Sequence, residues 1–493
     1  MKNIFFTTLI LIVLISGFNC NEDFPFDEFR NTVITTKPVD IITDSGIIAK
    51  AEFIGDFSRV TEYGFIWDQD RGNLTIDNTK KVVFKETPVL NFVEININHS
   101  LLPNEVYYLR AFAVTENIFV SGNIVIFKSK GISAPIINSI SKNYGSIGEE
   151  VIIYGDNFIN NFDTASIILG EVSANTNNIT NTEISVTIPL VPFQTHDLSV
   201  RILGKTSSVS FTVLDNWSDI SDFPGERRSG AVSFVISDYA YVGCGNNSNY
   251  IFNDLWRYDP VLNIWSRIAD FPGEPRNNLI AFELDGKGYI GLGEKYPIYY
   301  QDLWKYDPLT NSWEQINNFP ANMYKAVSFV INSSAYIGLG GSKEFWKYSS
   351  ESDSWEKTNN YPGNTDYSAT SFTIDNYAYV GTGNYSGNKE FFKFNVVNED
   401  WEQITDFPEK ITDGISFSLN EYGYVGYGKF WKYISSTNKW VQTSDFYQRN
   451  RYSSVSFKIN GRGYAGLGYY WYNSNKVFCN DFKKFNPNPT PEK

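Results

Sequence analysis

Residues 265–293 read WSRIADFPGEPRNNLIAFELDGKGYIGLG, and this phrase occurs six times in the second half of the chain. It begins with Trp, runs to a turn that is Phe-Pro or Tyr-Pro in five copies and Phe446-Tyr447 in the last, crosses an apolar stretch and reaches Tyr-x-Gly-x-Gly. The opening residues are Trp217, Trp265, Trp313, Trp355, Trp401 and Trp440. The final steps start at Tyr241, Tyr289, Tyr336, Tyr379, Tyr424 and Tyr464. The opening Trp residues follow one another every 39–48 residues, and a period of this length, built from short apolar runs and Gly turns, predicts a β-propeller.

The composition is that of a folded, β-rich chain. Its 493 residues are enough for three or four domains of about 100–200 residues each. Aromatic residues make up 17% of the chain, which favours packed strands over disorder. The net charge is −14, without a cluster of Lys and Arg, so nucleic acid is excluded as a partner and the acidic balance serves solubility.

The first 19 residues, MKNIFFTTLILIVLISGFN, have the short apolar core of a signal peptide and are too short to favour a membrane span. Cys20 follows directly and resembles the lipid-modified Cys of bacterial lipoproteins, although Asn19 stands where Gly, Ala or Ser is usual. The resemblance implies export through the inner membrane and a lipid anchor at the outer membrane or cell surface, with residues 20–30 as a tether. The alternative is an ordinary secretory signal with an incidental Cys.

Two modules precede the repeats. Residues 31–130 contain L-P-N-x-x-Y-Y-x-R-A-x-A at 102–113, which resembles bacterial fibronectin type III modules and implies a β-sandwich. Residues 133–214 contain the pattern P-x-I-x-S-I followed by G-x-x-G-x-x-V-x-I-x-G-x-N-F, which resembles the IPT/TIG immunoglobulin-like domain. In that pattern we expect Gly155 to permit a turn and Phe158 to fill the sandwich. Such modules act as spacers or protein contacts.

Residues 217–487 resemble kelch repeats, since aromatic third strands such as Leu255–Tyr258 follow each Gly-rich step. The usual Gly-Gly pair is Gly-x-Gly here. The last repeat has no fourth-strand Trp, whereas Trp217 precedes the first, so we expect the N-terminal strand to complete the sixth blade. Residues 488–493 form a tail. The predicted fold class is all-β: two N-terminal β-sandwich modules followed by a six-bladed kelch-type β-propeller.

Few residues of this chain suit catalysis. Its two histidines, His99 and His196, both precede the propeller, which excludes Ser-His-Asp triads and His-based metal sites there. We expect no catalytic residue, metal or cofactor; Asp68 and Asp70 could belong to a calcium loop, but a solvated loop is the simpler interpretation. Cys244 and Cys479 lie in the first and last repeats, which become neighbours on closure, so a disulfide between them stays open.

Alignment of the repeats on their first strands brings three arginines to one position. Six residues before the first-strand Phe stand Arg228, Arg276 and Arg451, in three contiguous blades. The other copies have Met323, Asp366 and Ile411 at this position. The loops joining the second and third strands are also long in the three Arg blades, and strand alternation puts them on the same face as the arginines.

The candidate ligand-binding residues are Arg228, Arg276, Arg451, Tyr250, Tyr299, Tyr300, Tyr470 and Trp471. Arg forks recognise carboxylates and hydroxyls, and flat rings pack on sugar faces, so this arc predicts a site for a glycan or an acidic ligand. Alternatively, the arginines brace neighbouring blades by bonding carbonyls, and the tyrosines only pack on each other.

The leading functional hypothesis is a non-enzymatic envelope protein, a surface lipoprotein that binds a glycan or protein through the propeller face. One alternative is a kelch-type sugar enzyme resembling sialate mutarotases, with Glu226, Glu274 and Asp366 as acid–base groups. A second alternative is a structural scaffold of the cell envelope.

Overall fold

The computed structural model describes residues 33–78, 80–85, 91–115, 118–159, 164–447 and 449–491. The expected signal peptide (1–19), Cys20 and the tether (20–30) lie outside these residues. The chain is all-β, as predicted; its one described helix is the short 3-10 helix η2, Arg71–Asn73. Within the described ranges, no helix has the length and apolar character needed to cross a membrane.

The first module is a sandwich of two sheets. One contains β1 (Val33–Thr36), β3 (Gly46–Ile54), β2 (Ile42–Thr43) and β6 (Phe92–Ile97). The other contains β5 (Lys81–Phe84), β4 (Glu62–Asp68), β7 (Val106–Val114), β8 (Phe119–Ser121) and β9 (Val125–Lys128). Tyr107 is buried in its core while its neighbour Tyr108 is only half-buried, because successive side chains of a strand point to opposite faces.

The second module is also a sandwich. Its first sheet has the order β10 (Ile136–Ile140), β12 (Glu150–Asp156), β16 (Glu183–Thr187) and β15 (Asn175–Ile179). Its second sheet has the order β11 (Tyr144–Ser146), β18 (Lys205–Leu214), β17 (Thr195–Ile202), β13 (Ser166–Leu169) and β14 (Val172–Ser173). Phe158 is buried, as predicted. Gly155 lies inside β12 rather than in a turn, and a Cβ there would meet the Ile136 carbonyl oxygen at 1.8 Å, so its role is close strand approach.

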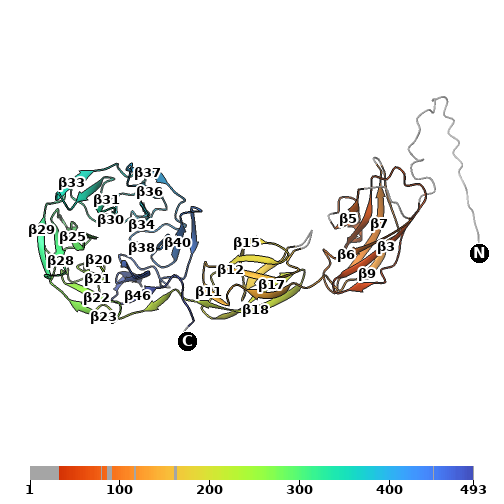
Figure 1. The fold of residues 1–493 in the computed structure, drawn as a ribbon, viewed down its shortest axis with the longest axis horizontal. Helices are drawn as coiled ribbons and strands as arrows, with labels where there is room; N and C mark the ends of the chain where they lie inside the picture. The colour runs from red at the N-terminus through yellow and green to blue at the C-terminus, as the bar shows by residue number, and fades with distance from the viewer. Residues whose placement is uncertain are drawn as a thin grey trace, which may run out of the picture. The chain divides into compact units, whose positions relative to one another are not determined.

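Six four-stranded antiparallel sheets follow and form a ring (Figure 1). Blade 1 is β20 (Val232–Ile236), β21 (Tyr239–Gly243), β22 (Leu255–Asp259) and β23 (Ile264–Arg267). Blade 2 is β24 (Ile280–Leu284), β25 (Lys287–Gly291), β28 (Leu303–Asp307) and β29 (Ser312–Ile316). Blade 3 is β30 (Val327–Ile331), β31 (Ser334–Gly338), β32 (Phe345–Ser349) and β33 (Ser354–Lys357). Blade 4 is β34 (Thr370–Ile374), β35 (Tyr377–Gly381), β36 (Phe391–Asn395) and β37 (Asp400–Gln403). Blade 5 is β38 (Ile415–Leu419), β39 (Tyr422–Gly426), β40 (Phe430–Ile434) and β41 (Lys439–Gln442).

Blade 6 draws its strands from both ends of the propeller sequence. It contains β42 (Val455–Ile459), β43 (Arg462–Gly466), β46 (Phe482–Phe485) and, as its outer strand, β19 (Trp217–Asp219). Trp217 pairs with Phe485 across β19 and β46. The predicted closure is therefore confirmed, and the ring has no open edge between its first and last repeats.

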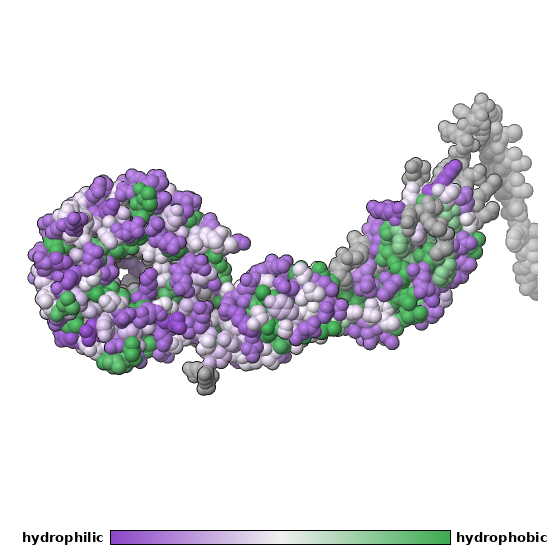
Figure 2. Space-filling view, viewed as in Figure 1, coloured by the Kyte–Doolittle hydropathy of each residue, from purple (hydrophilic) through white to green (hydrophobic). Residues whose placement is uncertain are grey.

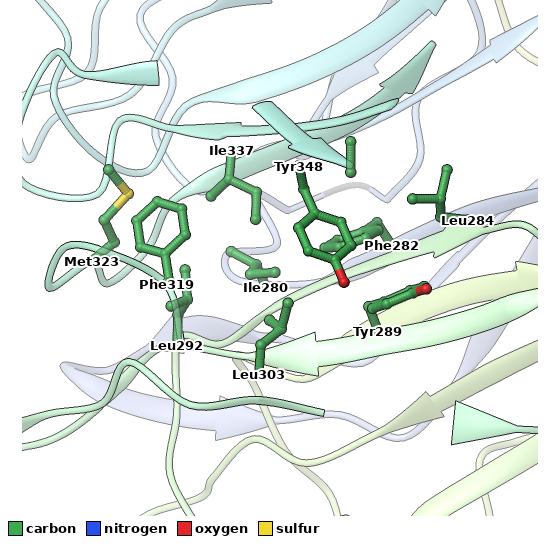
Figure 3. Packing of buried hydrophobic residues seen from close by; sticks show 11 residues of the cluster. Ile280, Phe282, Leu284, Tyr289, Leu292, Leu303, Phe319, Met323, Ile337 and Tyr348 are labelled. Atoms are coloured by element: carbon green, nitrogen blue, oxygen red, sulfur yellow. The ribbon is translucent and has the colours of Figure 1, made fainter. Parts of the chain in front are cut away.

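The repeated phrase holds neighbouring blades together. The Trp265 indole nitrogen donates to the Ser221 carbonyl at 3.0 Å, in the connection that enters blade 1, and its ring lies 5.3 Å from that of Phe223. The same ring pairing joins Trp217 to Phe446, Trp313 to Phe271, Trp355 to Phe319, Trp401 to Tyr361 and Trp440 to Phe407. Figure 3 shows the apolar core between blades 2 and 3 that this packing encloses.

Serines on the first strands connect the blades at the centre of the ring, where Figure 2 shows an opening. Each serine hydroxyl donates to a carbonyl of the preceding blade, and the Ser233 bond to Ser456 at 3.0 Å joins blade 1 to blade 6. Blade 2 has Ala281 at this position, so this type of bond does not join blade 2 to blade 1. The other bonds run from Ser328 to Ala281, Ser371 to Ser328, Ser416 to Ser371 and Ser456 to Ser416. A rigid disc results, on which loops of one face can be held in fixed positions.

Candidate ligand-binding face

The loops that enter the first strands and the loops between second and third strands meet on one face, as the sequence predicts. Short bridges connect the two loops in each Arg blade: Ser229 with Asn246, Asn277 with Glu294, and Tyr452 with Tyr469. In blade 2 the longer loop contains the hairpin β26 (Glu294–Lys295) and β27 (Ile298–Tyr299), and in blade 6 the hairpin β44 (Tyr469–Tyr472) and β45 (Asn475–Phe478). This surface is called the loop face below.

The three arginines lie buried beneath the loop face, and each one pairs with an aspartate. Arg228 places Nη1 and Nη2 at 2.5 and 3.0 Å from the two carboxylate oxygens of Asp254. The same two-bond pair joins Arg276 to Asp302 and Arg451 to Asp481. Burial alone would raise the pKa of these carboxyls, but the hydrogen bonds and charge of the arginines hold the pKa of each below its ordinary value.

Arg228 and Arg451 also donate to a backbone carbonyl at the start of their loops. Arg228 donates from Nη1 to the Cys244 carbonyl at 3.1 Å and from Nε to the Glu226 carbonyl at 2.8 Å. Its guanidinium carbon lies 4.9 Å from the ring of Phe223 and 4.1 Å from the ring of Phe252. The guanidinium is therefore enclosed by protein groups on both faces and along its edge. This geometry disfavours direct ligand contact by Arg228. It also differs from the expected bracing between neighbouring blades, because each arginine pairs with an aspartate of its own blade.

The other three blades fill this position differently. Met323 and Ile411 are buried in apolar clusters, and Figure 3 shows Met323 beside Phe319. Asp366 is half-buried. In blade 4 the preceding residue, Thr365, donates its hydroxyl to the Thr382 carbonyl at 2.5 Å, and so replaces part of the arginine's bonding.

The predicted aromatic residues divide into exposed and anchoring groups. Tyr250, Tyr299 and Trp471 are 65%, 37% and 52% exposed. Tyr300 is half-buried and its ring lies 4.2 Å from the guanidinium carbon of Arg276, while half-buried Tyr470 lies 5.5 Å from that of Arg449. The exposed three can reach a ligand, whereas Tyr300 fixes its loop to the blade.

A circle of six residues surrounds the channel mouth on the loop face. Each residue lies two positions before a first strand and has a left-handed backbone with φ between 49° and 60°. Most of them donate a backbone N–H to the carbonyl of the equivalent residue in the preceding blade, as Ser368 does to Lys325 at 2.9 Å. The circle consists of Gly230, Asn278, Lys325, Ser368, Asp413 and Ser453.

The side chains of this circle form a polar centre. Lys325 Nζ lies 3.1 Å from a carboxylate oxygen of Asp413, so the pair spans from blade 3 to blade 5. The Ser453 hydroxyl donates to the same carboxylate at 3.1 Å. Asn278 donates from Nδ2 to Glu294 at 2.8 Å. The channel mouth therefore presents donors and acceptors with the lysine charge neutralised.

Two rows of aromatic rings flank the polar centre. The first row is Tyr299, Tyr324, Tyr367 and Tyr385, with successive ring centroids 5.4, 6.2 and 5.1 Å apart. The second row is Tyr427, Tyr452, Tyr469 and Trp471, with spacings of 5.5, 5.5 and 6.0 Å. Burial raises the pKa of Tyr324, and raises that of Tyr469 to about 12, so both hydroxyls stay protonated at neutral pH and can donate.

Sequence reasoning missed most of these residues, although the same alignment contains them. Tyr324, Tyr367 and Tyr452 occupy the position directly after that of the arginines, and the circle occupies the next one. Tyr385 was missed because it lies in blade 4, outside the Arg blades; it is 82% exposed. A search for aromatic residues at equivalent positions in all six copies would have found these three tyrosines.

The remaining candidates are placed as follows. Cys244 and Cys479 are buried free thiols rather than a disulfide. Burial raises the pKa of the Cys244 thiol to about 12. Glu226 and Glu274, the acid–base candidates of the enzyme alternative, are exposed. No group of three potential metal ligands occurs among the described residues.

Comparisons with known proteins identify one module. Residues 135–213 match the IPT/TIG domain family, so the second sandwich is an IPT/TIG domain, as predicted. The search of curated proteins found no match to this chain. Among solved structures, that of YjhT matches with 16% sequence identity and a TM-score of 0.47, over 54% of this chain and 96% of that chain.

Proposed function

We propose that this protein is a carbohydrate-binding protein of the bacterial cell envelope, which holds its ligand on the loop face of a kelch-type propeller. The observation that carries the proposal is the placement of exposed aromatic residues. All the exposed Tyr and Trp side chains among the described propeller residues lie on loops between second and third strands: Tyr250, Tyr296, Tyr299, Tyr385, Trp471 and Tyr472. The rings of the exposed class thus lie on one face among the described propeller residues.

Rings exposed around a polar centre suit a sugar. Aromatic faces cover the apolar C–H surface of a sugar ring, while Lys325, Asp413 and Ser453 supply donors and acceptors for its hydroxyls. The Arg–Asp pairs hold the loops in place before the ligand arrives, and preorganised loops lose less entropy on binding. The buried arginines are therefore positioning residues in this proposal.

The envelope location rests on the sequence. The lipoprotein-like start around Cys20, the fibronectin type III-like module and the IPT/TIG domain are consistent with a propeller displayed by spacer modules. If Cys20 carries lipid, Cys20→Ser should move the protein from the membrane fraction to the soluble fraction, because anchoring depends on the acyl chains. Retention of this variant in the membrane fraction would contradict the lipid anchor.

The binding proposal is tested with a glycan array probed by the whole chain without its signal peptide. We expect the wild-type protein to bind a set of glycans, and the double variant Tyr385→Ala/Trp471→Ala to lose that binding at an unchanged melting temperature, because both side chains are largely exposed. Tyr154→Ala is the matched control, since Tyr154 is an exposed aromatic residue of β12, outside the propeller. Equal binding by the double variant and the wild type would contradict a role for the loop face.

A further inference from the structure

The arrangement of the loop face points to a neutral polysaccharide segment of several sugars as the ligand, rather than a single sugar or an acidic glycan. This inference rests on the proposed function and specifies the class of ligand. Three observations carry it: the length of the aromatic rows, their position on either side of the polar centre, and the balance of charge.

The rows are longer than one sugar needs. The first row holds four rings with centroids 5.1–6.2 Å apart, and the second holds four more. A single sugar ring covers about one aromatic face. The outermost rings, Tyr385 and Trp471, are 82% and 52% exposed, so they gain burial only from a ligand that reaches well beyond the channel mouth.

The polar centre connects the two rows. Tyr324 and Lys325 are adjacent in the chain, as are Tyr452 and Ser453. Lys325 and Ser453, which both bond the Asp413 carboxylate, thus directly follow one ring of each row in the chain. A chain of sugars that rests on both rows must cross the Lys325–Asp413 pair. One sugar of the chain would then meet the charged groups through its hydroxyls.

The charge balance argues against an acidic ligand. The guanidinium groups of Arg228, Arg276 and Arg451 are buried and paired with carboxylates, and the Lys325 charge is neutralised by Asp413. The chain as a whole carries a net charge of −14. Two further cations of the loop face lie over its rings, Lys476 at 4.4 Å from Tyr469 and Arg449 at 5.0 Å from Tyr472. The expectation of a neutral ligand therefore rests on the paired charges of the polar centre and on the net charge of the chain, which repels a polyanion.

The inference is tested with linear gluco-, manno- and xylo-oligosaccharides of one to six units, and with polygalacturonate as the acidic probe, by calorimetric titration of the whole chain without its signal peptide. For at least one neutral series we expect affinity to rise tenfold or more from one to six units. Tyr385→Ala and Trp471→Ala should each weaken binding of the six-unit sugar by about two- to tenfold, and Tyr154→Ala should change nothing.

The outcomes separate the inference from the proposed function. Equal affinity for one unit and six units, or tighter binding of polygalacturonate than of every neutral series, would overturn the inference and leave carbohydrate binding in place. Binding of none of these sugars would overturn the inference, and the glycan array then decides the proposed function separately. If the double variant Tyr385→Ala/Trp471→Ala shows the same rise of affinity with sugar length as the wild type, the aromatic rows do not bind the sugar chain. This result would also overturn the inference.

Discussion

Blades 1, 2 and 6 differ from blades 3, 4 and 5 in how they hold the loop between the second and third strands. In the first group the loops are long, at 244–254, 292–302 and 467–481, and a buried Arg–Asp pair lies at the base of each. In blades 3 and 5 the loops shorten to 339–344 and 427–429, and Met323 or Ile411 occupies the arginine's position in the core.

The residue at the arginine's position therefore has a different role beneath a long loop than beneath a short one. A short loop needs only an apolar side chain beneath it. A long loop needs its two ends fixed, and the arginine contacts both: in blade 1 it bonds the Cys244 carbonyl at the start and Asp254 at the end. Buried ion pairs add little net stability compared with apolar packing, but they demand one geometry. The pairs therefore position loops rather than strengthen the core.

Blade 4 lies between the two groups. Its loop, 382–390, is of intermediate length, and the donors that hold it are uncharged side chains. Thr365 bonds the Thr382 carbonyl, and Asn388 donates to the Thr365 hydroxyl at 2.9 Å. Glu390 accepts from Asn364 at 2.7 Å. A network of uncharged donors can thus hold a loop that still presents the exposed Tyr385.

The largest expected effect comes from breaking one pair on one side. Arg276→Met should lower the stability of the propeller by about 3–5 kcal/mol, because the Asp302 carboxylate is left without its partner in a buried site. The measurement is the midpoint of thermal or urea unfolding. Arg267→Met is the matched control, since Arg267 forms an exposed pair with Asp270 in the same blade, which is worth about 1 kcal/mol or less. Equal losses of stability in the two variants would show that the Arg276–Asp302 pair contributes no more than the exposed Arg267–Asp270 pair.

A smaller effect is expected on acidification. The arginines hold the pKa of Asp254, Asp302 and Asp481 below the ordinary value, which is about 3.9 in an unfolded chain. The stability they contribute is therefore complete above that value and is lost as pH falls through the folded-state pKa. Thermal midpoints at pH 6, 4 and 3 should fall less in a variant that lacks one pair, Arg276→Met/Asp302→Leu, than in the wild type.

Other carboxyl groups of the chain gain stability for the folded state as pH falls. The contribution of the Arg–Asp pairs is therefore measured as a difference between the variant and the wild type. Burial raises the pKa of Asp215 and Asp445, so the folded state takes up their protons first and gains stability from it as pH falls. Both residues remain in the variant and the wild type. If the two proteins lose stability in parallel between pH 6 and 3, the Arg–Asp pairs do not account for the acid response.

The sequence alone was enough to predict the parts of the fold that repeat. The Trp, the Phe-Pro turn and the Tyr-x-Gly-x-Gly step recur at nearly fixed spacing, and they predicted the propeller, the closing strand at Trp217 and the long loops of three blades. The propeller and its closing strand rest on contacts that recur around the ring. The indole nitrogens of Trp217, Trp265, Trp313, Trp401 and Trp440 each donate to a backbone carbonyl, so the repeated pattern in the sequence predicts these contacts.

The role of the arginines could not be predicted in this way. Arg228 and Asp254 are 26 residues apart, and they meet only because the long loop folds back over the entering loop. An arginine buried beneath a loop and an arginine facing solvent could both stand six residues before the first-strand Phe, so the spacing does not distinguish them. The aspartate directly before the third strand, present in blades 1, 2 and 6 alone, was the available signal, and it would have indicated pairing in place of ligand contact.

The tryptophans of the third strands also differ between a blade with an Arg–Asp pair and a blade without one. In blade 2 the Trp304 indole nitrogen donates to Asp302 at 2.8 Å, whereas in blade 5 that of Trp431 is buried without a partner among the described residues. Trp304→Phe should cost about 1.5–3 kcal/mol more than Trp431→Phe, because it loses a hydrogen bond to a charged group. Urea denaturation of both variants measures the difference, and equal midpoints would contradict it.

Removing both members of a pair should cost less stability than removing the arginine alone. Arg276→Met/Asp302→Leu leaves no unpaired charge behind, and the loss of about 1.5–3 kcal/mol that remains comes from the Trp304 indole nitrogen, whose acceptor is Asp302. The loop 292–302 should nevertheless lose its fixed ends, so its amides should exchange hydrogen faster, and a sugar that contacts Tyr299 should bind more weakly. A double variant as unstable as Arg276→Met would show that the pair itself stabilises the blade. A double variant with wild-type stability, exchange and binding would show that the pair does not position the loop.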